Sequence, residues 1–160
     1  MPATIYELKT YNPYDAYLND MGDNRFRYNQ FNDKIKGLSE KFQDFIFDTV
    51  PADFIKDRVS MPLGLNQNQS KETAKIVMDL ILSNLYLGNI VGEVQNRLGV
   101  DDQKAKTIAV LVVAELFTPI LDDLKKMHIE KFAKNLPPPQ IQNNPPAVGD
   151  DRIIDLKNSL

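Results

Sequence analysis

The chain has 160 residues, of which 26% are charged and 42% hydrophobic, with a formal net charge of −3, no cysteine, no tryptophan and one histidine. This length fits one globular domain with appended segments, while the missing cysteines exclude disulfide frameworks, thiolate nucleophiles and cysteine zinc sites. The even, slightly acidic charge supplies no broad cationic field for phosphate backbones or anionic lipid, and the first residues lack the basic and apolar regions of a signal peptide, so we expect a cytoplasmic protein.

Residues 1–28 form an aromatic arm that contains five of the six tyrosines. Asn12 followed by Pro13 is typical of a helix start, because Asn accepts a first-turn hydrogen bond and Pro at the first position loses none. Apolar and aromatic side chains then recur on one helical face, at Tyr14, Tyr17, Leu18 and Met21. The arm is therefore expected to be partly helical and docked on the rest of the protein.

Residues 29–134 carry helix-sized apolar segments separated by Gly or Pro, which is typical of an all-α bundle. The pattern predicts about five or six helices, near residues 29–47, 50–60, 67–88, 90–98, 102–116 and 120–134. The segment 102–116 is apolar over more than half of its circumference, so we expect it to be the central helix. Gly88 is the expected stop of the third helix, and Pro119 must kink or restart the chain.

Residues 135–160 form a proline-rich tail, whose composition favours disordered, extended geometry over a packed core. Near its end lies an apolar cluster, called the tail cluster below: Ile153, Ile154 and Leu156. We interpret it as a candidate docking peptide. Docking on a partner protein, docking on the protein's own bundle, and a segment without function remain open as alternatives.

The segment Arg25-Phe26-Arg27-Tyr28 mixes cations and rings, as platforms for single-stranded nucleic acid do. Aspartates on both sides of it neutralise this charge locally. Nucleic-acid contact at these four residues is therefore the weaker hypothesis, and rings packed on the bundle are the simpler one.

The last helix carries the nearest approach to an acid and base pair, Asp122 or Asp123 with His128. Spacings of five and six residues do not align such groups on one helical face. The helical period leaves either Met127 or His128 to face inward, and we interpret His128 as a partly exposed surface residue. No nucleotide-binding, hydrolase, metalloprotease or kinase motif occurs in the sequence. We therefore expect no catalytic, cofactor-binding or metal-ligating residue, and a carboxylate-dependent enzyme is the remotest alternative.

Several segments between Leu38 and Met127 carry a resemblance: Ser-Lys-Glu-Thr-Ala-Lys-Ile-Val-Met at 70–78, Leu-Gly at 87–88, Leu-Gly-Val-Asp at 98–101 and Phe-Thr-Pro-Ile-Leu-Asp-Asp-Leu-Lys-Lys-Met at 117–127. Through them this stretch of 90 residues resembles a family of small, uncharacterised bacterial helical proteins. The resemblance implies a helical bundle. It implies no activity or catalytic residue, and it does not extend to the aromatic arm.

Together these patterns predict a non-catalytic cytoplasmic protein that binds another protein, through an apolar groove of the bundle or through the tail cluster. Self-association into a homo-oligomer is one form of this hypothesis. Association with RNA or a ribonucleoprotein through residues 25–28 is the alternative, and salt dependence separates the two, because phosphate contacts weaken steeply with ionic strength. The most apolar segment, 107–121, is too short and interrupted for a membrane span, so none is expected.

Overall fold

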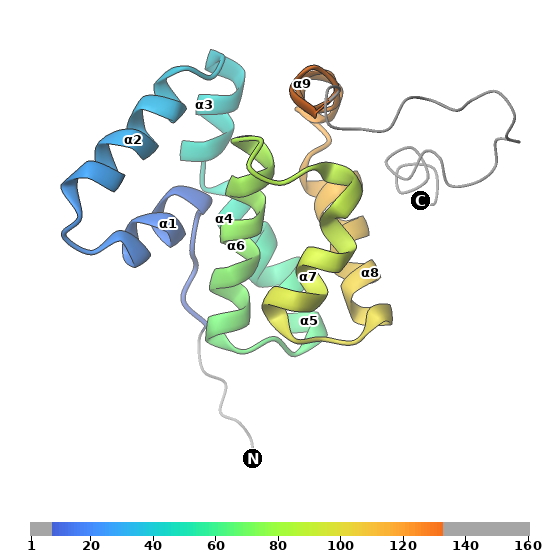
Figure 1. Cartoon of the computed structure of the whole chain (residues 1–160). Helices are drawn as coiled ribbons and strands as arrows, with labels where there is room; N and C mark the ends of the chain where they lie inside the picture. The colour runs from blue at the N-terminus through green and yellow to red at the C-terminus, as the bar shows by residue number, and fades with distance from the viewer. Residues whose placement is uncertain (1–7, 133–160) are drawn as a thin grey trace, which may run out of the picture.

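A computed structural model of the protein describes residues 8–132 (Figure 1). Every regular element in this range is helical and none is a strand, so the predicted all-α class is confirmed. The α-helices are α1 (Pro13–Met21), α2 (Arg25–Lys36), α3 (Glu40–Phe47), α4 (Val50–Phe54), α5 (Met61–Leu63), α6 (Gln67–Ile81), α7 (Ile90–Leu98), α8 (Asp102–Val110) and α9 (Leu121–Phe132). Wider π-helical turns extend α4 over Ile55–Ser60 and α8 over Leu111–Leu116, and a 3₁₀ turn at Leu87–Asn89 precedes α7.

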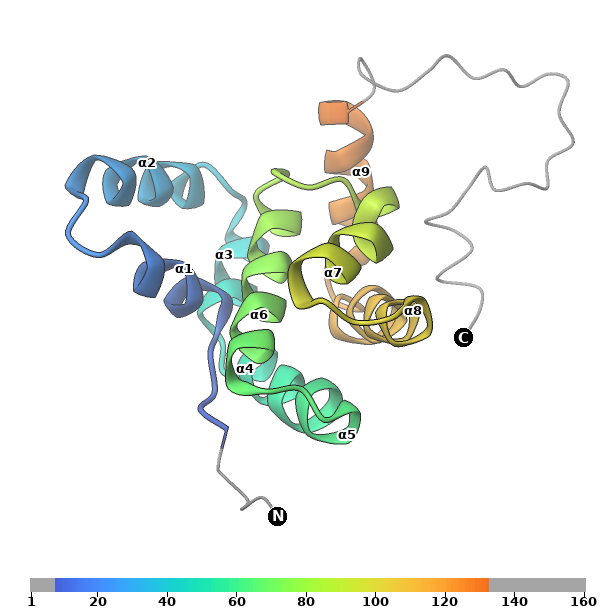
Figure 2. The same ribbon diagram turned by 60° about the horizontal axis from the view of Figure 1, so that its bottom comes forward.

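Helix α6 is the central element of the bundle, with α1, α7 and the turn Ile55–Ser60 packed around it (Figure 2). It begins with a capping box: the Asn66 side chain accepts the Gln69 backbone N–H at 2.8 Å, and the Gln69 side chain accepts the Asn66 N–H at 2.9 Å. Its second half is enclosed by neighbours. The side chains there that are at most 1% exposed are Ile76, Val77, Met78, Leu80 and Ile81.

The segment 102–116 is not the central helix that its composition predicts. It is divided into α8 and the turn Leu111–Leu116, and it packs mainly on α7, which leaves Val110 and Leu111 only half-buried. The first half of α6 carries several charged side chains, so its amphipathic pattern looks like that of a peripheral helix. Ion pairs with neighbouring helices, described below, allow it to occupy the centre.

The helix predicted over 29–47 is two helices. α2 begins earlier, at Arg25, because the Asn24 side chain accepts a first-turn backbone N–H at 3.0 Å. It ends at Gly37, and the Ser39 hydroxyl accepts a backbone N–H at 3.4 Å to start α3. The apolar period runs across this break without interruption, which is why it predicts a single helix.

Helix α6 ends at Ile81, well before Gly88, the predicted stop. The chain reverses at Ser83, whose φ of 62° lies in the left-handed region that usually requires glycine. Gly88 has a different role: a Cβ atom there would lie 2.5 Å from the Tyr86 ring. Glycine at 88 therefore permits the Tyr86 ring to approach the backbone closely. The sequence does not reveal this role, because a glycine after an apolar segment looks like a helix stop.

Helix α1 confirms the predicted docking helix of the arm. It starts at Pro13, and the Asn12 side chain accepts a backbone N–H at 2.8 Å. Ala16 is fully buried and Met21 is 8% exposed, because this face of α1 packs on α6. The break before α9 is also confirmed, since the chain turns at Pro119. Over residues 8–132, no helix has both the length and the apolar character needed to cross a membrane.

Candidate functional site

The densest set of paired polar side chains lies between α1, α6 and α7, around Asp79. Asp79 is 8% exposed, and its Oδ1 accepts hydrogen bonds from the Tyr17 hydroxyl of α1 and, at 3.2 Å, from the Asn84 amide. Its Oδ2 accepts from Arg97 of α7 at 2.7 Å, and Arg97 also pairs with Glu72 at 3.2 Å. Burial alone would lower the pKa of Arg97, but the hydrogen bonds and charges of Asp79 and Glu72 outweigh burial and raise it.

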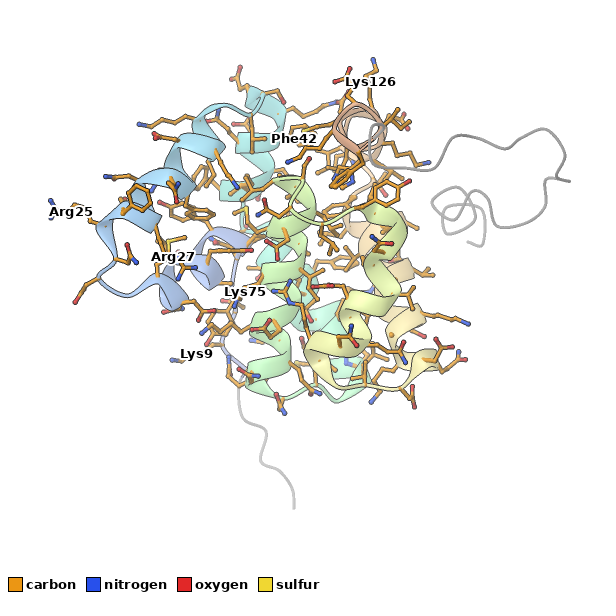
Figure 3. All side chains as sticks on the ribbon, viewed as in Figure 1. Lys9, Arg25, Arg27, Phe42, Lys75 and Lys126 are labelled. Carbon is orange, nitrogen blue, oxygen red and sulfur yellow. The ribbon has the colours of Figure 1, made fainter. Side chains whose placement is uncertain are left out.

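The same seam continues toward the end of α1 through Asp20. Lys71 pairs with Asp20 at 2.8 Å, and Lys75 pairs with both Asp20 and Glu72. Hydrogen bonds from Lys71 and then Lys75 lower the pKa of Asp20. Figure 3 shows Lys75 on the side of α6 that faces α1. Because these charges satisfy one another, we interpret the set as an ion-pair network that joins three helices.

Asp79 escapes prediction because its partners are distant in the chain: Arg97 is 18 positions away and Tyr17 is 62 positions away. One signal does exist in the sequence. A single acidic residue within the apolar run from Ile76 to Leu82 must either be exposed to solvent or, if it is buried, pair with another polar side chain.

His128 lies in the core, so the expected surface position is wrong. Its exposure is 0%, its Nδ1 accepts the Leu87 backbone N–H at 3.1 Å, and its Nε2 lies 2.7 Å from the Leu80 carbonyl oxygen. These partners require the neutral ring with its proton on Nε2. Burial lowers the pKa of His128, and the charge of Lys131 acts in the same direction. The histidine satisfies two backbone groups next to the end of α6.

The four residues of the nucleic-acid hypothesis, Arg25, Phe26, Arg27 and Tyr28, form the first turn of α2. The simpler hypothesis, that their rings pack on the bundle, is wrong for Phe26, which is 70% exposed, while Tyr28 is 43% exposed. Figure 3 shows Arg25 directed outward at the end of α2 and Arg27 on the side of α2 that faces α1. The turn therefore presents rings and cations to solvent on more than one side.

An aromatic stack holds α2 against α1. Phe31, which is 5% exposed, lies between Tyr14 and Tyr17, with ring centroids 5.4 Å and 5.2 Å apart and nearly parallel planes. Tyr14 also contacts Phe47 of α3 at 5.0 Å, and the Phe47 ring is 53% exposed. Burial and the neighbouring Tyr28 hydroxyl raise the pKa of Tyr14. The exposed Phe47 ring of α3 is thus continuous with the buried stack.

Helix α2 also forms a cleft of about 180 Å³ with α1 and the segment that follows α6, and Tyr17 and Phe31 of the stack line it. The apolar part of its lining is Met21, Phe31 and Leu82. The polar part includes Arg27, Lys34 and Asn84, and the Lys34 ammonium donates to the Asn84 side-chain oxygen at 3.2 Å. This set, called the α2 cleft below, combines positive charge with an apolar floor. Arg27 is the one lining residue that belongs to the predicted nucleic-acid segment 25–28.

The tail cluster, Ile153, Ile154 and Leu156, lies outside the described residues. Within the described range there is no group of three or more histidine, aspartate or glutamate side chains placed to hold a metal ion. Comparison with known proteins finds no matching family model, no matching curated protein and no matching solved structure.

Proposed function

We propose that this protein is a non-catalytic cytoplasmic interaction module, which uses α2 to bind a protein segment carrying acidic and apolar side chains. One observation carries the proposal: the cations of α2 have no carboxylate partner anywhere in residues 8–132. The charged side chains of α2 are Arg25, Arg27, Asp33, Lys34 and Lys36, a net charge of +3 in a chain whose total is −3. A locally positive helix on an acidic protein favours an acidic partner.

Exposed rings give this surface an apolar component. Phe26 and Tyr28 project from α2, and Phe47 of α3 extends the surface next to Tyr14. Burying one such ring in an interface contributes about 2 kcal/mol, and aromatic and arginine side chains are the residues most enriched among binding hot spots. The tail cluster remains proposed as a docking peptide, and self-association would place it on a second copy of α2.

Single-stranded RNA is the second candidate ligand, because Phe26 is 70% exposed between two arginines and could stack on a base. A protein partner is favoured over RNA because the positively charged surface is small. The positive charge is confined to one helix of 12 residues, and the chain as a whole is acidic. Tight non-specific RNA binding requires many phosphate contacts along a basic groove.

The test is affinity isolation with the full chain as bait, comparing the wild type with a Phe26→Ala and Tyr28→Ala double variant. We expect the double variant to recover its specific protein partners at least tenfold less well, which corresponds to about 1.4 kcal/mol of lost binding. Recovery by the wild type should survive nuclease treatment and weaken only moderately between low and moderate salt, because salt screens the charge contacts of α2 but not the burial of its rings.

The matched control is a Met61→Ala and Ile129→Ala double variant, since these side chains are 54% and 60% exposed but lie on other helices. It should recover partners as the wild type does. Equal loss in both double variants would remove α2 as the binding surface. Recovery that disappears after nuclease treatment would favour the RNA alternative instead.

A further inference from the structure

The α2 cleft is suited to a peptide side chain rather than to a small-molecule cofactor. Its volume of about 180 Å³ lies below the range of roughly 300–1,000 Å³ of sites for drug-sized ligands. The floor of Met21, Phe31 and Leu82 fits an apolar side chain, and Arg27 and Lys34 at the same opening fit a carboxylate. The occupant should therefore carry an acidic residue next to an apolar one.

One segment of this chain has that composition. Residues 150–156 read Asp-Asp-Arg-Ile-Ile-Asp-Leu, with three acidic residues and one basic residue, a net charge of −2. Asp155 stands between two members of the tail cluster, Ile154 and Leu156. The charge of this segment complements the two cations that line the cleft, Arg27 and Lys34, and its apolar side chains complement the cleft floor.

The connecting chain is long enough to allow contact within one molecule. Twenty residues separate Phe132, the end of α9, from Ile153, and an extended chain of that length spans about 66 Å. A folded unit of this size has a radius of gyration of only about 14 Å. Because a tethered segment has an effective concentration of the order of millimolar, even a weakly binding peptide would occupy the cleft.

We propose that residues 150–156 dock in the α2 cleft of the same molecule, with the Asp155 carboxylate at Arg27 and Lys34 and an adjacent apolar side chain of the tail cluster on the floor. The inference deepens the proposed function and rests on it, because it names a resident occupant of the helix that a partner would have to displace.

The absence of cysteine allows a direct test with the full chain. A Ser159→Cys variant carries a unique nitroxide label, and the amide signals of the labelled and reduced protein are compared by NMR. We expect Met21, Gln30 and Phe31 to lose more than half of their signal intensity, at every protein concentration measured.

Charge reversal on the two flanks of α2 provides the matched comparison. Arg25 and Lys36 each lie two residues along the chain from a cation of the cleft. A spacing of two residues corresponds to about 200° around the helix, and neither side chain lines the cleft. An Arg27→Glu and Lys34→Glu variant should restore the lost intensity, whereas an Arg25→Glu and Lys36→Glu variant with the same change in net charge should not. Ile154→Ser with Leu156→Ser should restore it as well, without touching α2.

Three results would overturn the inference. If a mixture of isotope-labelled and spin-labelled chains shows the effect between molecules and dilution removes it, the occupant is a second copy. If both charge reversals restore the signals equally, the attraction is general electrostatics rather than docking. If no cleft amide is affected, the tail does not bind there. None of these results removes the proposed function. That proposal is tested separately, by partner recovery with the Phe26 and Tyr28 double variant, its control variant and nuclease treatment, and the same comparison can be made in a chain lacking residues 150–160.

Discussion

Helices α6 and α2 carry similar numbers of charged side chains but use them differently. In α6 every charged residue forms an ion pair: Lys71, Glu72, Lys75 and Asp79. In α2 no charged residue pairs with an opposite charge in the part of the chain that the structure describes, and its exposed Phe26 has no role in the packing of the bundle. The comparison shows that polar composition alone does not distinguish a helix that builds the core from one that is available for binding. The distinction lies in whether neighbours supply the counter-charges.

The largest expected effect comes from removing a counter-charge of α6. Arg97→Met should leave Asp79 and Glu72 without their guanidinium partner in a mostly buried seam, at a cost of about 3 kcal/mol in the free energy of unfolding. The same substitution on α2, Arg27→Met, should change stability by less than about 0.5 kcal/mol. Urea unfolding of the two variants measures both values. Similar losses in the two would mean that the helices do not differ in the way proposed.

His128 of α9, which packs beside the end of α6, should dominate the pH dependence of stability near neutrality. Burial holds the pKa of His128 below its unfolded value of about 6.5, so the folded state binds fewer protons than the unfolded chain. Stability is therefore complete above about pH 6.5 and falls as the pH decreases toward the lowered folded pKa, by up to about 1.4 kcal/mol per pH unit.

Urea unfolding at pH 7.5, 6.5 and 5.5 tests the assignment to His128. A His128→Gln variant lacks the titrating ring, so it should be less stable than the wild type at pH 7.5 but lose little more on acidification. A wild-type slope that persists unchanged in this variant would assign the pH dependence to other groups.

A smaller effect, in the stabilising direction, is expected where α6 ends. Ser83 has a positive φ, and its buried hydroxyl has no hydrogen-bond partner in the described residues. Ser83→Gly should remove both the backbone strain and the unsatisfied hydroxyl, raising the free energy of unfolding by about 1 kcal/mol. Ser83→Ala removes only the hydroxyl and should gain less. If alanine equals or exceeds glycine in thermal unfolding, the positive φ carries no strain.

Local signals were sufficient to predict much of this fold. Asn12-Pro13 starts α1 where expected, and α7 and α8 begin at the predicted positions 90 and 102, with Gly99 ending α7 at a φ of 68° and the Asp101 side chain capping α8. These features depend on residues close together in the chain. The reversal at Ser83 and the buried position of His128 depend on contacts with residues more than 40 positions away, or on strain that only the packed core can hold. The same limit hides the α2 cleft, because it exists only once three helices are assembled.

The smallest expected effect on stability is at Phe26, and it is the most informative about function. The ring is 70% exposed, so Phe26→Ala removes little buried surface, and alanine favours the helix by up to about 0.7 kcal/mol. Thermal unfolding should therefore be unchanged or slightly improved, while partner recovery should fall. By contrast, Phe31→Ala empties the stack between Tyr14 and Tyr17 and should release α2, which amide hydrogen exchange would detect as lost protection confined to that helix. A clear destabilisation by Phe26→Ala would mean that the ring contributes to the fold. Phe26 could then no longer be counted among the apolar contacts that α2 offers to a partner.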